Sequence, residues 1–122
     1  IGLVPHKSNY RKYVHKIDHS SIFFLINPTD PWEKVIDSIA SCHSIVSSSL
    51  HGLICADAYH IPNLWLDEYK LTEGDFKFKD YFLSQKRDYV KISSLKEYDP
   101  SLLYDKGNSI DLNVLEDAFP FS

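Results

Sequence analysis

The residues best suited to chemistry gather in residues 47–52, which read Ser-Ser-Ser-Leu-His-Gly. Hydroxyls and an imidazole stand there at the point where a buried strand gives way to a helix. The first N–H groups of a helix have no partner within it and carry the positive end of its dipole. With Ser48, Ser49 and His51 beside them, they suit a phosphate or a carboxylate. Gly52 would let a ligand approach the first turn without a Cβ in the way.

A simpler interpretation of the same segment stays open, in which Ser49 only caps the helix and His51 is a solvated first-turn residue.

The expected position in the sheet makes a second histidine, His6, a candidate. Ligands of open parallel sheets bind beyond the carboxyl ends of the strands. His6 follows an apolar run at residues 1–4, so it is expected at that edge together with His51. Taken alone, His6 would be interpreted as a loop histidine.

Three charged residues are weaker candidates. Lys77 is expected in the first turn of a helix, where it would reach a bound anion or act as an ordinary surface lysine. Asp67 and Glu68 follow a strand and could hold a hydroxyl or act as a base, although a solvated acidic loop is the favoured interpretation. The sequence has neither the Gly-rich dinucleotide fingerprint nor a phosphate-loop Gly-Lys-Ser/Thr pattern. We expect no cofactor and no metal.

Short apolar strands alternate with amphipathic helices along the chain. The run at residues 22–26 is continuously apolar, which is typical of a strand covered on both faces. Asp30, Pro31 and Glu33 have the spacing of an N-cap, a first helical position and a capping box. We expect strands at residues 1–4, 22–26, 44–47, 63–66 and 89–92, and helices at 10–17, 31–40, 49–58, from 75 onward and at 110–118.

Strands spaced by helices predict right-handed crossovers and a mainly parallel sheet. The expected fold class is therefore α/β, a Rossmann-like three-layer domain. Residues 1–122 form a single domain in this interpretation, and residues 100–122 are its closing segment. The chain begins at Ile1, directly on an apolar run, which suggests a piece of a longer protein.

Composition excludes two kinds of partner. The net charge is −4 and the 13 basic residues are scattered, so we expect no nucleic-acid surface. The longest apolar run is far shorter than the roughly 20 residues that a membrane span needs. Cys42 and Cys55 have no zinc-finger spacing and are interpreted as reduced thiols of a cytoplasmic protein.

Residues 47–62 resemble the signature of the polysaccharide pyruvyl transferase family. Two flanking stretches strengthen the resemblance: residues 1–6, Ile-Gly-Leu-Val-Pro-His, and residues 76–82, Phe-Lys-Phe-Lys-Asp-Tyr-Phe. The chain departs from the family pattern where Ser49 replaces an Arg found in some members, where Lys7 to Asn9 replace aromatic and acidic residues, and where His60 replaces the usual Gly.

The resemblance implies the C-terminal half of a two-domain, GT-B-like enzyme, with a missing N-terminal domain as its partner. It implies phosphoenolpyruvate as donor and a glycan or lipid-linked sugar of a surface polysaccharide as acceptor, joined as a pyruvate ketal. His51 and His6 would then be catalytic donor-site residues, and Ser48, Ser49, Gly52 and Lys77 would bind substrate.

Acid–base catalysis by a histidine suits such a reaction. Two alternatives stay open. The chain would be the donor-binding domain of a GT-B nucleotide-sugar glycosyltransferase, or an isolated anion-binding half-domain without activity.

Overall fold

The computed structural model describes residues 1–17, 22–67, 72–87 and 90–105. The closing helix expected at residues 110–118 lies outside this range. In the part of the chain that is described, no helix is long and apolar enough to cross a membrane.

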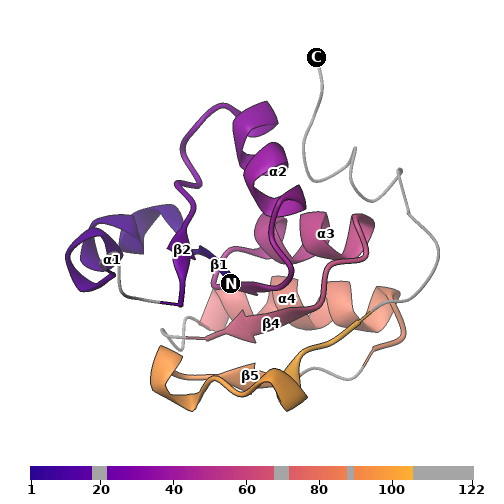
Figure 1. The fold of residues 1–122 in the computed structure, drawn as a ribbon. Coiled ribbons are helices and arrows are strands. Elements are labelled where there is room, and N and C mark those ends of the chain that lie inside the picture. Colours follow the sequence, from indigo (N-terminus) through magenta and orange to yellow (C-terminus); the bar gives the residue numbers. More distant parts are fainter. Residues whose placement is uncertain (18–21, 68–71, 88–89, 106–122) are drawn as a thin grey trace.

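The core of the fold is a parallel sheet with the strand order β2-β1-β3-β4-β5 (Figure 1). Its strands are β1 (Gly2–Val4), β2 (Phe24–Leu25), β3 (Ile45–Ser47), β4 (Asn63–Leu66) and β5 (Lys91–Ile92). The chain runs from β1 outward to β2 and then crosses back to β3 on the other side of β1. The strand order therefore reverses between β1 and β3, which is where open α/β sheets bind their ligands.

Side chains alternate across the sheet and bury two separate cores. Val4, Ile45 and Trp65 face the core that contains residues of α2 (Trp32–Ala40), α3 (Leu50–Ala58) and α4 (Thr72–Ser84). Leu3 and Val46 face the other core, which contains Tyr13 of α1 (Tyr10–Lys16) and residues of two 3-10 turns, Leu95–Glu97 and Pro100–Leu102. The predicted three-layer α/β arrangement is confirmed.

Helix α3 is the central helix of its layer. Its residues from Gly52 to Ala58 are all buried, so no side of the helix faces solvent apart from its first turn. The helix ends before His60, whose φ of 57° lies in the left-handed region. A glycine adopts that region without a Cβ penalty, which accounts physically for the glycine that the family usually has there.

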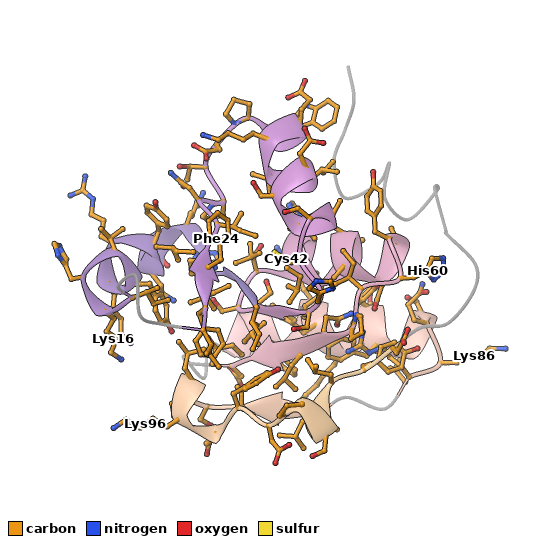
Figure 2. The ribbon with its side chains drawn as sticks, viewed as in Figure 1. Lys16, Phe24, Cys42, His60, Lys86 and Lys96 are labelled. Carbon is orange, nitrogen blue, oxygen red and sulfur yellow. The ribbon has the colours of Figure 1, made fainter. Side chains whose placement is uncertain are left out.

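Two local predictions were wrong. Strand β2 is the edge of the described sheet, and it is not covered on both faces: Phe24 is 60% exposed and Ile22 is 65% exposed (Figure 2). The capping box does not form either. Helix α2 begins at Trp32, so its N-cap residue is Pro31, and no side chain makes a capping hydrogen bond there. Asp30 instead forms an ion pair with Lys34 at 3.5 Å.

The bounds of the other elements are close to those expected. Strands β1, β3 and β4 lie within one residue of their predicted limits, whereas α4 begins at Thr72, three residues before Asp75. In α1, Tyr13 is buried, whereas its apolar neighbour Val14 is exposed.

Candidate functional site

The carboxyl ends of β1 and β3 are tied together by hydrogen bonds. Val4 and Ser47 are partners in the sheet, and the N–H of Ser48 donates to the Val4 carbonyl at 3.0 Å. Beyond the end of β1, the N–H of His6 donates to Ser48 Oγ at 2.8 Å. The loop after β1 and the turn after β3 thus meet at the point of strand reversal. We call residues 5–6 and 48–52 the switch-point edge.

The first serine of the turn has a structural role. Ser47 is fully buried, and its Oγ accepts the N–H of Ser49 at 2.9 Å. The same Oγ lies 2.9 Å from the Val4 carbonyl and 2.6 Å from the Ser49 carbonyl, either of which takes its proton. Ser47 therefore has no capacity left for a ligand, and it holds β3, β1 and the start of α3 together.

The other two serines keep hydrogen-bonding capacity. Ser48 Oγ accepts from His6, and no residue in the described ranges accepts the Ser48 hydroxyl proton. Ser49 occupies the N-cap position of α3, but its side chain makes no capping hydrogen bond. The first N–H groups of α3 therefore receive nothing from Ser49, contrary to the simpler interpretation of this serine. Hydroxyl and amide donors remain at the positive end of the helix.

His6 is an exposed residue that caps the 3-10 turn Lys7–Asn9 with its ring. Its Nδ1 accepts the backbone N–H of Ser8 at 3.2 Å and lies 2.7 Å from Ser8 Oγ. His6 is thus anchored twice, through its backbone to Ser48 and through its ring to Ser8.

His51 lies in the first turn of α3 and is exposed, yet nearby protein atoms remove part of the water around its ring. This desolvation is the main reason why the pKa of His51 is lowered from its ordinary value of 6.5, and the positive charge of Lys77 lowers it further. The structure therefore brings Lys77 of α4 within electrostatic range of His51. A neutral imidazole at neutral pH is able to accept a proton.

Gly52 has a different role from the expected one. A Cβ at this position would overlap Ser47 Oγ and lie 3.1 Å from the Cβ of Val4. The missing side chain is therefore needed for close packing of α3 on β3 and β1. It faces the sheet, and it does not open a path for a ligand.

Asp67, which follows β4, is buried, and its carboxylate pairs with Lys91 of β5 at 2.8 Å. The interpretation of Asp67 as part of a solvated loop is wrong, and Glu68 lies outside the described residues. Lys91 was not singled out from the sequence. The sequence did contain a signal for this pair, because Lys91 is a lysine within the strand expected at residues 89–92.

A second set of polar residues lies at the opposite end of the sheet. Asp57 of α3 accepts hydrogen bonds from Arg87 at 2.8 Å, Tyr81 Oη at 2.6 Å and Asn63 Nδ2 at 2.7 Å. We call these four residues the Asp57 cluster. Burial, and then the charge of Asp57, raise the pKa of Tyr81, so its hydroxyl stays protonated and donates. An acidic residue within an apolar helix was the signal that sequence reasoning did not use.

The guanidinium of Arg87 is sandwiched between two rings, 3.8 Å from the centroid of Tyr104 and 4.4 Å from that of Phe82. Such stacking on aromatic faces is typical of buried arginines. It ties residue 104, which also bridges to Asn63 through two backbone hydrogen bonds, to the body of the fold.

Neither thiol is activated. Burial raises the pKa of Cys55 to about 12 and also raises that of Cys42, so neither forms a reactive thiolate at neutral pH. Within residues 1–17, 22–67, 72–87 and 90–105, no group of three or more His, Cys, Asp and Glu side chains is placed to hold a metal ion.

Comparison with known proteins adds independent information. The family model for polysaccharide pyruvyl transferase matches residues 3–68, more than half of the chain. "Uncharacterized protein L143" of Acanthamoeba polyphaga mimivirus is 32% identical over 109 residues, which cover 83% of this chain and 38% of that protein. The chain thus corresponds to less than half the length of this relative. No solved structure matches. The matched region contains most of β1, the serine turn and all of α3, and the chain belongs to the polysaccharide pyruvyl transferase family.

Proposed function

We propose that this chain is the donor-binding part of an enzyme that transfers a pyruvyl group from phosphoenolpyruvate to a sugar of a surface polysaccharide, forming a pyruvate ketal. The observation that carries the proposal is the meeting of His6, Ser48 and the first turn of α3 at the switch-point edge. The Ser48 hydroxyl and the first N–H groups of α3 lie where His6 and His51 also lie. Phosphoenolpyruvate offers both a phosphate and a carboxylate to such donors.

The chemistry that fits is proton transfer at an enol phosphate. Protonation of the methylene carbon makes the neighbouring carbon electrophilic, and a sugar hydroxyl adds to it with loss of its proton. Phosphate then leaves, and a second hydroxyl adds to the same carbon and loses its proton. One of the two hydroxyl protons replaces the one given to the methylene group, and the other leaves with phosphate, so the reaction is balanced without a cofactor.

His51 is the residue assigned to these proton transfers. Its lowered pKa makes it neutral before the donor binds. A bound phosphate and carboxylate are negative charges that favour the imidazolium, so donor binding raises the pKa of His51 and supplies the acid for the first step. The deprotonated ring then accepts a hydroxyl proton. Lys77 assists by adding positive charge within electrostatic range of His51.

The remaining parts of the proposal concern the larger protein. A GT-B-like arrangement would place a second domain opposite the switch-point edge and would supply the acceptor site for a glycan or lipid-linked sugar. The donor and the sugar precursors are cytoplasmic compounds, so we place the enzyme in the cytoplasm. The match covers only 38% of the length of the mimivirus protein, which supports the proposal that a second domain takes part.

Transfer by the complete protein tests the assignment of His51. We expect His51→Ala to lower ketal formation from phosphoenolpyruvate by about 100-fold to 10,000-fold, the usual contribution of a general acid–base group. His15→Ala is the matched control, because His15 is exposed on α1 and is not part of the switch-point edge. Near-normal transfer by His51→Ala would contradict the assignment.

Calorimetry separates the donor classes. The intact protein should release or absorb heat with phosphoenolpyruvate and should give no signal with UDP-sugars or GDP-sugars. The reverse result would favour a nucleotide-sugar glycosyltransferase. In this chain one carboxylate oxygen of Asp67, an acidic candidate for holding a hydroxyl, pairs with Lys91. Binding of phosphoenolpyruvate without transfer by the complete protein would favour the non-catalytic anion-binding alternative.

A further inference from the structure

We infer that His6 is a fixed hydrogen-bond donor to the anionic substrate through Nε2–H, that Ser8 holds its ring in this tautomer, and that proton transfer is left to His51. The inference deepens the proposed function, on which its substrate depends. Its structural part concerns Ser8 and the His6 ring and can be tested without any substrate.

The first step concerns the direction of one hydrogen bond. A backbone N–H is only a donor, so the Ser8 N–H that lies 3.2 Å from His6 Nδ1 requires a lone pair on that nitrogen. A proton on Nδ1 would face the Ser8 N–H directly. The neutral ring that accepts this N–H carries its proton on Nε2, and the Ser8 hydroxyl, 2.7 Å from Nδ1, shares the same lone pair.

The second step concerns the position of the ring. The N–H of His6 donates to Ser48 Oγ at 2.8 Å, which fixes the His6 backbone against the turn after β3. The backbone of His6 is extended, with φ −60° and ψ 145°, as expected of a residue that caps the following turn with its side chain. Backbone and ring are thus held at separate points, one on Ser48 and one on Ser8.

The third step concerns what the site can still offer. Nε2 has no hydrogen-bond partner among the residues that the structure describes, and its proton is therefore available. The Ser48 oxygen has already accepted from His6, so Ser48 also offers a proton. A ring N–H of His6 and a hydroxyl proton of Ser48, on two residues whose backbone and side chain are hydrogen-bonded, suit a phosphate or carboxylate oxygen. They are unsuited to removing a proton from a sugar hydroxyl.

Ser8 is then a positioning residue, whose effect reaches the substrate through His6. Nitrogen NMR of the intact protein with labelled histidine reads the tautomer directly. We expect His6 to show a larger Nε2–H fraction than His15, an exposed histidine of the same chain that serves as the solvent reference. Ser8→Ala keeps the backbone N–H and removes only the hydroxyl, so it should lower the Nε2–H fraction of His6 part of the way toward that of His15. Ser8→Thr keeps both donors and should leave the fraction unchanged.

Ser101→Ala is the matched control. Ser101 has the same place in the 3-10 turn Pro100–Leu102, where its N–H donates to the capping Asp99 at 2.9 Å, and it lies away from His6 in the sequence. This variant should leave the tautomer of His6 unchanged. If His6 and His15 have the same tautomer ratio, or if Ser8→Ala changes nothing, the inference is overturned.

Transfer by the complete protein supplies the second readout. Glutamine can place an N–H near the position of Nε2, whereas asparagine places its amide near Nδ1. We expect His6→Gln to keep kcat/KM within about tenfold of the wild type and His6→Asn to lose roughly tenfold more, as for a hydrogen bond to a charged group. Equal losses would refute the donor role. A confirmed tautomer in a protein that does not bind phosphoenolpyruvate would refute only the proposed function.

Discussion

Residues of one type have different physical states at the switch-point edge. Ser47 is buried with all its hydrogen bonds made, Ser48 accepts one bond and keeps its proton, and Ser49 stands at the N-cap without capping. The sequence shows only three consecutive serines. Which of them faces a strand carbonyl and which faces the ligand edge depends on pairing with Val4 and His6, some 40 residues away, and that pairing is not visible in local spacing.

The charge state of His51 gives a prediction at the same scale. Desolvation, and then Lys77, keep the pKa of His51 below 6.5, so removing the charge by Lys77→Gln should raise it toward that value. Titration of the His51 ring by NMR measures the shift. Lys96→Gln is the control, since Lys96, labelled in Figure 2, is an exposed lysine of the turn Leu95–Glu97 and is not among the causes of the lowered pKa of His51.

The sign of the pH effect on stability follows from the same shift. With the pKa lower in the folded state, the unfolded chain binds the proton more readily, so stability rises with pH in this region. The contribution of the neutral ring is fully present above pH 6.5 and is lost as the pH falls through the folded pKa. An unchanged His51 pKa in Lys77→Gln, or an equal change in Lys96→Gln, would show that Lys77 does not act on this ring.

At the scale of elements, contact between α3 and the sheet depends on Gly52. Alanine in a helix interior normally stabilises relative to glycine, by up to about 1 kcal/mol. Here the new Cβ would overlap Ser47 Oγ and crowd Val4, so we expect Gly52→Ala to lower the free energy of unfolding by about 1–3 kcal/mol. Urea denaturation measures this value.

A double-mutant cycle identifies the cause of that loss. Ser47→Ala removes the overlapped oxygen, so Gly52→Ala should cost less when Ser47→Ala is already present. Equal costs in both backgrounds would mean that the loss does not come from the Ser47 contact. A stabilising Gly52→Ala would show that α3 does not pack as closely on β3 as described.

Sequence patterns were sufficient for elements whose signals are local. Residues 63–66 form a short apolar run before a polar loop, and they form β4 as expected. The position of a strand within the sheet, in contrast, could not be predicted from local sequence. The run at residues 22–26 resembles a central strand, but it forms the edge strand β2, since only the order of pairing decides which strand has one neighbour. The predicted cap of α2 is absent because the helix begins at Trp32, so Pro31 and not Asp30 occupies the N-cap position.

The candidate site followed from topology more than from any single residue. The expectation that His6 and His51 share one edge rested on strand alternation, and the structure places both at the strand reversal. The roles of Ser8 and Lys91 were not foreseen, since a hydrogen bond to a ring nitrogen and an ion pair across two strands require coordinates.

On the scale of the whole molecule, the two ends of the sheet differ in how their polar groups are used. The carboxyl ends of β1 and β3 keep donors that no described residue accepts. At the other end, the Asp57 cluster uses both carboxylate oxygens within the protein and joins α3, β4 and the segment after α4. Exposed donors at a sheet edge are suited to binding, whereas a buried carboxylate that is paired through both oxygens holds elements in place.

The Asp57 cluster should accordingly dominate stability and not chemistry. Removing one partner of a buried ion pair leaves the other charge without compensation, so we expect Asp57→Ala to lower the free energy of unfolding by about 3–5 kcal/mol. Asp57→Asn should cost less, because an amide keeps one acceptor oxygen for Arg87 or Tyr81. Urea denaturation monitored by tryptophan fluorescence is suitable, since Trp65 is buried nearby in the same core.

The exposed pair Lys34–Asp30 provides the contrast, because its lysine is largely solvated and the two charges are 3.5 Å apart. Lys34→Ala should change the free energy of unfolding by less than about 1 kcal/mol. If Asp57→Ala cost no more than Lys34→Ala, the cluster would not hold α3 to β4 and to the segment after α4. If Asp57→Asn folded normally but lost binding of phosphoenolpyruvate, the division between the two ends of the sheet would be wrong, because a residue at the satisfied end would then act on the ligand.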